Sequence, residues 1–304
     1  MEHEMSSAPD NHLTLFQQYR PLLFSIAYQM LGSAMEAEDI LQDAYLRFLP
    51  VPLRTVESPR AYLSAIITRL CLNQLASARV QRESYVGPWL PEPILDANYP
   101  ELTTPDMHVN DYESVSLAFL ALLERLTPAE RAVFLLREVF DYEYHEIAEM
   151  LDKSQTACRK LFSRAKSYIA TNRPRFTPSP EEHRRLLTEF MTAVGNGNLS
   201  GLTEMLAEDI TFWADGGGKA PGAALKPVRG RDDVARFVLA VTARHLPQDA
   251  QFTVANVNSL PTLLIRHPDG EPALVVSIEA DPFGIHNIWV IANPDKLKAV
   301  KNGI

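Results

Sequence analysis

The chain has 304 residues, more than one ordinary domain holds, so two or three domains are expected. Apolar residues make up 46% of it and charged residues 22%, which are globular proportions and exclude a disordered or fibrous protein. Cys71 and Cys158 are its two cysteines and lie far apart, so we expect neither a disulfide framework nor a zinc site of four Cys and His ligands. Its apolar runs fall short of the roughly 18 residues that span a bilayer, and residues 1–10 lack the pattern of a secretory signal. We therefore expect a cytoplasmic protein with no membrane partner.

The net charge of −9 is unevenly distributed along the chain. Residues 54–82 hold five Arg and one acid, and residues 153–175 hold seven Lys or Arg and no acid. The acids gather instead in Glu36–Asp43, Asp96–Glu113 and Glu138–Asp152. Two basic stretches on an acidic chain indicate two anion-binding faces, although two solvated helix faces would show the same charges.

Residues 13–82 show helical periodicity in three stretches. Gly32 and Ser33 separate the first two stretches, and Pro50 and Pro52 separate the second from the third. Ser58 followed by a proline is typical of a helix N-cap with Pro at the first helical position. The pattern predicts a compact helical bundle over residues 12–83.

Residues 84–111 carry several prolines and no period, which predicts a stiff linker. Helical periodicity returns over residues 112–172, where Thr127 and Glu130 flank a Pro-Ala pair in the pattern of a capping box. A second proline-rich linker follows at residues 172–180.

The pattern changes over residues 181–304. An amphipathic stretch, Glu182–Val194, and a short helix around Leu199–Leu206 precede a series of strand-like runs. These runs are Ile210–Trp213, Phe252–Asn258, Thr262–Arg266, Ala273–Glu279 and Ile285–Ile291. Helices followed by a curved antiparallel sheet make an α+β domain.

The segment Phe140–Ala165 has the pattern of a helix-turn-helix. Its first half is apolar on one face, Asp152 and Lys153 form a tight turn, and Ser154 can cap a second helix. Hydrogen-bonding and cationic side chains remain for the outer face of that second helix, as reading of the DNA major groove requires. A helical hairpin packed for structural reasons is the alternative.

Three separate blocks, at Tyr19–Leu49, Ser58–Glu83 and Leu126–Lys166, together resemble the extracytoplasmic-function (ECF) sigma factors of RNA polymerase. Within Tyr19–Leu49, the stretch Ala37–Phe48 matches the signature of the region that binds core polymerase. Ser58–Glu83 resembles the following region, which recognises and opens the −10 promoter element, and Leu126–Lys166 resembles the region that binds the −35 element. The resemblance is collinear and implies sigma region 2 over 12–83 and sigma region 4 over 112–172.

The resemblance implies core RNA polymerase and promoter DNA as partners. On the helix over residues 36–48, a polar strip beside apolar residues suits docking to a basic coiled coil, with charge setting the register. A solvated acidic face is the alternative. The expected polymerase-binding residues are Glu38, Asp39, Gln42, Asp43, Leu46 and Phe48.

Two further residue sets are expected to meet DNA. The −10 set offers guanidinium groups for phosphates and Tyr62 and Asn73 for unstacked bases, although Tyr62 could equally be a core residue. It comprises Arg60, Tyr62, Arg69, Asn73, Arg79 and Arg82. The −35 set comprises Ser154, Gln155, Thr156, Arg159, Lys160, Ser163, Arg164 and Lys166. Ala157 and Leu161 stand where the common family pattern has Thr and Arg, so the promoter sequence is less predictable.

Three shorter motifs resemble one group of these sigma factors, which carries a fused C-terminal SnoaL-like domain of the nuclear-transport-factor cone fold. They are the linker motif Trp89-Leu90-Pro91-Glu92-Pro93, the motif Asp215-Gly216-Gly217-Gly218-Lys219, and Asn293-Pro294-Asp295-Lys296-Leu297. Their joint occurrence suggests one composite regulatory interface, in which the C-terminal domain holds the linker. The alternative is that Trp89 packs on its own helical domain and the other two motifs are ordinary turns. The expected fold is therefore multidomain: two all-α domains, the second a helix-turn-helix, followed by an α+β cone-like domain over 181–304.

The C-terminal domain offers Asp215, His245 and His286 as its acid/base candidates. An enolisation site needs a carboxylate base and an oxyanion donor such as Tyr, and all ten tyrosines lie at or before Tyr168. We therefore expect a sigma factor that is not an enzyme and needs no cofactor or metal, with a small-molecule ligand of the C-terminal pocket left open. The alternatives are a helix-turn-helix regulator with a ligand-binding domain and one fused to a SnoaL-like enzyme of the isomerase type.

Overall fold

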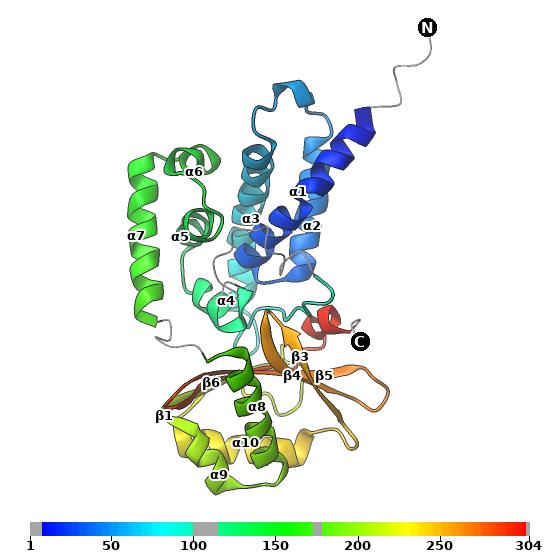
Figure 1. Ribbon diagram of the computed structural model, residues 1–304, viewed down its shortest axis with the longest axis vertical. Helices are drawn as coiled ribbons and strands as arrows, with labels where there is room; N and C mark the ends of the chain where they lie inside the picture. The colour runs from blue at the N-terminus through cyan, green and yellow to red at the C-terminus, as the bar shows by residue number, and fades with distance from the viewer. Residues whose placement is uncertain (1–7, 100–114, 173–177, 302–304) are drawn as a thin grey trace. The chain divides into compact units, whose positions relative to one another are not determined.

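The computed structural model describes residues 8–99, 115–172 and 178–301 (Figure 1). The chain divides into two compact units. The helical unit comprises Met1–Gln81, Pro100–Ser114 and Leu122–Asn172, and the C-terminal unit comprises Arg82–Tyr99, Val115–Ala121 and Arg173–Ile304. Residues 84–99 of the expected linker thus pack as part of the C-terminal unit, while its residues 100–111 lie outside the described part.

Three helices begin the helical unit, and a short 3-10 turn at Leu53–Thr55 lies between the second and the third. They are α1 (Ala8–Leu31), α2 (Ala34–Phe48) and α3 (Pro59–Glu83). Gly32 separates the first two with a φ of +69°, a left-handed conformation that glycine adopts without a Cβ clash. Ser33 then caps α2, because its Oγ accepts a hydrogen bond from the Glu36 amide at 3.2 Å. The helical character predicted for this part of the chain is confirmed.

The second half of the helical unit contains the predicted helix-turn-helix. After α4 (Leu117–Leu123), most of which belongs to the C-terminal unit, the chain forms α5 (Pro128–Phe134), a π-helical turn at Leu135–Val139, α6 (Tyr144–Leu151) and α7 (Gln155–Asn172). Thr127 and Glu130 form the expected capping box of α5. Asp152 adopts a left-handed conformation at the end of α6, and the Ser154 Oγ accepts from the Ala157 amide at 3.2 Å at the start of α7.

The C-terminal unit is a sheet covered on one face by helices α8, α9 and α10 (Figure 1). The helices span Pro180–Gly195, Leu199–Met205 and Arg231–His245. The strands are β1 (Leu206–Asp215), β2 (Val228–Arg229), β3 (Gln251–Val257), β4 (Leu260–Arg266), β5 (Pro272–Asp281) and β6 (Gly284–Ile291). They lie in the order β2-β1-β6-β5-β4-β3, and a 3-10 turn at Lys296–Val300 follows β6. The α+β fold class is confirmed.

Two expectations for this unit were wrong in detail. The sheet is mixed, because β1 pairs with β6 in parallel, with Phe212 opposite Ile288, whereas the other pairs are antiparallel. Strands β3 to β6 alternate in direction through tight connections, and a crossover that includes α10 lets β1 run alongside β6. Helix α10 itself was not expected, although Val234 and Val238 repeat at helical spacing after an acidic first turn.

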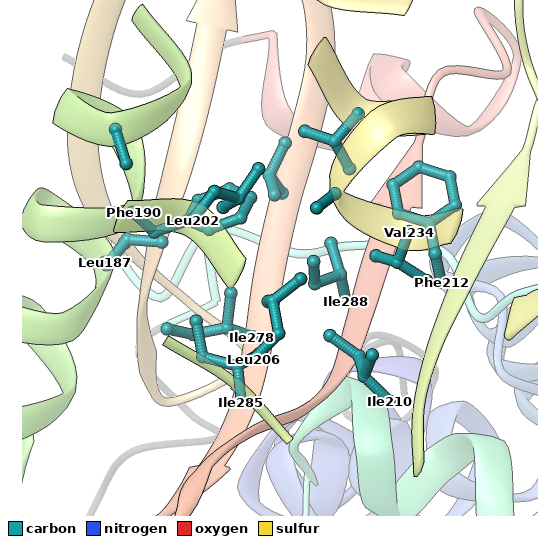
Figure 2. Packing of buried hydrophobic residues seen from close by; sticks show 14 of the residues in the cluster. Leu187, Phe190, Leu202, Leu206, Ile210, Phe212, Val234, Ile278, Ile285 and Ile288 are labelled. Carbon is teal, nitrogen blue, oxygen red and sulfur yellow. The ribbon is translucent and has the colours of Figure 1, made fainter. Parts of the chain in front are cut away.

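The sheet buries apolar side chains on both faces, and successive strand residues point to opposite faces. Toward the helices lies a core built from α8, α9, α10 and four strands (Figure 2). Its labelled members are Leu187, Phe190, Leu202, Leu206, Ile210, Phe212, Val234, Ile278, Ile285 and Ile288. Toward the other face lie Trp289, Leu264 and Leu297, packed with Leu90 and Leu95 of the linker. The linker segment is therefore part of a hydrophobic core.

Candidate binding surfaces

Helix α2 presents most of the predicted polymerase-docking strip to solvent. Asp39, Gln42 and Asp43 are exposed, and Leu46 is 63% exposed. Glu38 is half-buried and pairs with Arg20 at 2.6 Å. The exposed Met35 on the same helix lies outside the predicted set. The strip combines acidic groups with apolar side chains that water reaches.

Phe48 does not belong to this surface, and its assignment as a docking residue is corrected to a core residue. Its side chain is fully buried and packs edge-on against the ring of His12 at a centroid distance of 5.1 Å. The reason is helical register, because Phe48 continues the buried stripe of Ile40 and Ala44.

Two arginines of the predicted −10 set bind backbone carbonyls within the helical unit. Arg60 donates to the Phe140 carbonyl at 2.6 Å, with its guanidinium 4.2 Å from the centre of the Tyr142 ring. Arg69 donates to the carbonyls of Met150 at 2.8 Å and Glu149 at 2.9 Å. Helix α3 is thereby held against the helix-turn-helix segment.

A buried tyrosine adds to this α3 contact. Tyr142 donates its hydroxyl hydrogen to the Ser64 Oγ at 2.7 Å, and burial raises the pKa of Tyr142. Elsewhere on α3, Tyr62 is 37% exposed and Asn73 is exposed. Arg79 and Arg82 lie on α3, but their side chains are outside the described part.

Seven residues on α7 and Ser154 just before it, all exposed, make up the predicted −35 set: Ser154, Gln155, Thr156, Arg159, Lys160, Ser163, Arg164 and Lys166. Two of its cations are paired with acids. Arg164 lies 3.0 Å from Glu130, and Lys166 lies 2.9 Å from Glu138. Arg159 lies over the ring of Tyr144 at 5.1 Å. The first two turns therefore carry the exposed polar groups that are best placed for a DNA groove.

The three shorter motifs of the predicted interface meet at Asp215, which is fully buried. One carboxylate oxygen of Asp215 accepts from the Tyr85 hydroxyl at 2.5 Å, and the other accepts from the Leu90 amide at 2.8 Å. The Lys296 ammonium lies 2.7 Å from that second oxygen. We call this arrangement of Tyr85, Trp89, Leu90, Asp215, Asn293 and Lys296 the linker clasp.

Lys296 joins the remaining members of the linker clasp. Its ammonium donates to the Leu90 carbonyl and lies 4.0 Å from the centre of the Trp89 ring, a cation–π contact. Asn293 donates to the Tyr85 hydroxyl oxygen at 2.8 Å. Burial, together with the Asp215 carboxylate, raises the pKa of Tyr85 well above its usual range, so the hydroxyl remains a donor.

The rest of the three motifs lies around the clasp. Pro91, Glu92 and Pro93 are buried, and exposed Lys219 pairs with Asp295 at 2.5 Å. Gly217 has a φ of +56°, and a Cβ there would lie 2.4 Å from the Asn293 side chain, which explains the glycine. The joint occurrence of the three motifs had predicted that they lie close together. Tyr85 was not predicted, because no local pattern links it to Asp215, 130 positions away.

The three acid/base candidates of the C-terminal unit lie apart. Asp215 is in the clasp, and His245 lines a cavity between the sheet and the helices. His286 lies 2.9 Å from Asp281 and 3.2 Å from Asp209. Partial burial lowers the pKa of His286, but these carboxylates outweigh it and the net shift is upward. They do not form one acid/base site.

Within residues 8–99, 115–172 and 178–301, no group of three or more His, Cys, Asp or Glu side chains could hold a metal ion. Cys71 and Cys158 are both buried and free. Of the helices in these described ranges, none combines the length and apolar character that crossing a membrane requires.

Comparison with known proteins shows which family the chain resembles. Residues 15–80 match the model of sigma-70 region 2, and residues 116–169 match that of sigma-70 region 4. The chain is 35% identical over 289 residues to the ECF RNA polymerase sigma factor SigJ of Mycobacterium tuberculosis, covering 92% of this chain and 91% of SigJ. It is 30% identical over 288 residues to the probable ECF sigma factor SigI of that organism, covering 94% of each.

The three-dimensional arrangement agrees with the sequence match. The crystal structure of Mycobacterium tuberculosis SigJ superposes with a TM-score of 0.72 and 32% identity, covering 94% of this chain and 98% of SigJ. The match therefore includes the helical segments and the fused C-terminal sheet domain. The chain belongs to the ECF RNA polymerase sigma factors.

Proposed function

We propose that this sigma factor binds core RNA polymerase through α2, contacts the −35 element through α7 and the −10 element through α3, and thereby directs promoter-specific initiation. The observation that carries the proposal is the collinear match to regions 2 and 4, together with polar faces on α2 and α7 that solvent reaches. Promoter opening of this kind uses binding energy to unstacked bases and needs no cofactor or metal. A cytoplasmic location follows, because bacterial polymerase and DNA are there.

The linker clasp supports a regulatory role for the C-terminal domain. The linker leaves the region 2 helices at α3, and its residues 85–95 are fixed on the C-terminal sheet by Asp215, Lys296 and Asn293. A segment that connects two DNA-binding regions limits the distances that they can span. We therefore assign the C-terminal domain to control of the spacing between the promoter-binding regions.

The second candidate is a bifunctional protein with an enzymatic C-terminal domain. The cavity that would hold a substrate is lined by His245 but by no Asp, Glu, Lys, Arg or Tyr. Enolisation needs a carboxylate or equivalent base and an oxyanion donor in the same site. The lining therefore favours a domain that is not an enzyme.

Capture of core RNA polymerase by the full chain, followed by run-off transcription on a promoter library, tests the proposed function. The double variant Asp39→Lys and Asp43→Lys should abolish capture and transcription, because it reverses the charge of the docking strip. Helicity and melting temperature should remain nearly unchanged, since surface substitutions usually cost within about 0.5 kcal/mol.

The matched control is Glu57→Lys with Glu208→Lys, which makes the same charge change at two exposed acids outside α2. This variant should capture polymerase as the unaltered chain does. Equal capture by both double variants would show that the α2 strip is only a solvated face.

A further inference from the structure

The C-terminal unit contains an apolar cavity that the clasp does not use. It lies between α8, α10 and the sheet and has a volume of about 380 Å³. Aromatic and branched side chains form most of its wall, among them Phe190, Phe212, Val238, Ile265 and Ile288. Small-molecule sites in proteins have volumes of roughly 300–1,000 Å³ and mostly apolar walls. The cavity is therefore large enough for a small ligand.

The lining restricts the chemistry of that ligand. Its side-chain polar groups are those of Thr192, Thr242 and His245. Thr192 already donates to the Thr188 carbonyl at 2.9 Å, and His245 is exposed. A carboxylate or phosphate would find no Lys or Arg among the lining residues, and an unpaired charge in an apolar site is strongly unfavourable. The fitting ligand is uncharged, with one group that can hydrogen-bond to the imidazole.

The cavity and the linker clasp share structural elements. Ala214 lines the cavity and the next residue, Asp215, lies in the clasp, because successive strand residues face opposite sides. Ala292, the residue after β6, also lines the cavity and directly precedes Asn293 of the clasp. A molecule that touches these positions therefore touches the backbone that holds the clasp.

The loop after β1 forms a second link. Pro221, Gly222 and Ala223 line the cavity, while Gly217 lies directly against clasp residues Asn293 and Tyr85. A Cβ at Gly216 would lie 2.5 Å from the Ala223 Cβ, so the two ends of the loop pack tightly on each other. Residues 221–223 therefore connect the cavity wall to the glycine turn.

We propose that the cavity binds an uncharged, largely hydrocarbon molecule with a single hydrogen-bonding group, and that its occupancy tightens the linker clasp. The proposal adds a ligand to the regulatory role assigned above and rests on that role. By thermodynamic linkage, a ligand that binds the closed clasp more tightly than the open one stabilises the closed clasp. Closure of the clasp in turn raises the affinity of the cavity for the ligand.

Fluorescence titration of the full chain with N-phenyl-1-naphthylamine tests the site. This uncharged probe should bind saturably at one equivalent, and 1-anilinonaphthalene-8-sulfonate, which has a related ring system with a charge, should bind at least tenfold more weakly. Gly195→Phe should lower probe affinity at least tenfold, because Gly195 lines the cavity and a Cβ there meets no atom within 4 Å.

Two further variants serve as a second cavity-filling test and as a control. Val241→Trp fills the cavity from α10 and should reproduce the loss, in case Gly195→Phe fails to fold. Leu225→Trp adds the same ring at a position that is 65% exposed and outside the lining, and it should leave probe affinity unchanged. Absence of saturable binding, or binding that both filling variants leave intact, would overturn the proposal.

Amide hydrogen exchange measures the coupling. Saturating N-phenyl-1-naphthylamine should slow exchange in residues 85–94 at least threefold, with the Leu90 amide as the reporter because it donates to Asp215. The filling variants should lose this response. Probe binding with unchanged amide exchange would overturn the coupling between the cavity and the clasp. In that case Trp89→Ala should still alter transcription, because the clasp would regulate without a ligand. Failure of this inference is thus distinguishable from failure of the proposed function.

Discussion

At the scale of single residues, the clasp depends on one buried charge. Asp215 has no exposed surface, and the side chain of its cationic partner Lys296 is 12% exposed. Removal of one partner from a buried ion pair leaves an uncompensated charge and typically costs about 3–5 kcal/mol, whereas replacement of both can be nearly neutral. The pair can therefore be tested as a double-mutant cycle.

We expect Asp215→Asn and Lys296→Met each to lower the free energy of unfolding of the C-terminal unit by about 3 kcal/mol. The double variant should be destabilised by less than the sum of the two, because neither charge then lacks its partner. Urea unfolding followed by tryptophan fluorescence measures this, since Trp213 and Trp289 stack in the sheet. Asp295→Asn, which alters an exposed ion pair with Lys219, is the control and should change little. Strict additivity would contradict a coupled pair.

The residues that sequence reasoning placed well are those with a local pattern. The exposed face of α7 follows from helical spacing around buried Cys158 and Ala165. The same spacing predicts Phe48 in the core, four residues after Ala44. It was assigned to the docking strip because it is part of the family signature. Tyr85 carries no such signal, because its role depends on a contact with Asp215 that only the folded chain creates.

At the scale of elements, the helices of the first half were predictable and the sheet topology was not. Caps and breakers such as Gly32 and Thr127 mark helix ends in the sequence itself. The parallel pairing of β1 with β6 joins strands separated by almost the whole domain, and no local pattern encodes that partner. The fold class was therefore accessible, while strand order was not.

Helix α3 and the helix-turn-helix segment provide the next prediction. Arg60 and Arg69 use N–H donors on the carbonyls of Phe140 and Met150, so those donors become available to promoter phosphates only when this contact opens. Promoter binding by α3 should therefore require this contact to open. Tyr142→Phe removes the bond to Ser64 and keeps both arginines and the aromatic ring beside the Arg60 guanidinium, so it should favour the open arrangement.

A lost hydrogen bond of about 1 kcal/mol shifts such an equilibrium about fivefold. We expect Tyr142→Phe to widen the distance between spin labels on exposed positions of α3 and α6 in the free chain, and to increase promoter binding by the holoenzyme. Tyr144→Phe on α6, whose ring packs against Phe162, is the matched control. An unchanged label distance in Tyr142→Phe would contradict a contact that must open.

At the scale of the whole molecule, the units defined by packing differ from the segments defined by sequence. Residues 82–99 and 115–121 belong to the C-terminal unit, although they precede and begin the region 4 segment along the chain. Leu90, Leu95 and Leu117 are buried in the core on the outer face of the sheet. The C-terminal domain is therefore built in part from the linker whose geometry it is proposed to control.

Two truncations test whether the C-terminal domain regulates the promoter-binding regions through the clasp or is only carried with them. A chain that ends after Ala292 loses Asn293 and Lys296, along with buried Leu297 and Val300, so the linker loses its clasp but keeps the sheet. Promoter-specific run-off transcription should increase, because the two DNA-binding regions gain freedom of spacing. A chain that ends after Thr177 leaves linker residues such as Leu90 and Leu95 without their core. Its transcription should fall, because the relative orientation of the two regions is lost.

Removal of residues 302–304 alone is the control for both truncations, and it should transcribe like the full chain. The opposite signs expected for the two truncations are the informative feature, since a general loss of folding would lower transcription in both. X-ray scattering of the free proteins should show a broader distribution of distances for the chain ending after Ala292 than for the control. Transcription equal to that of the full chain in both truncations would mean that the C-terminal domain is carried without regulating the promoter-binding regions.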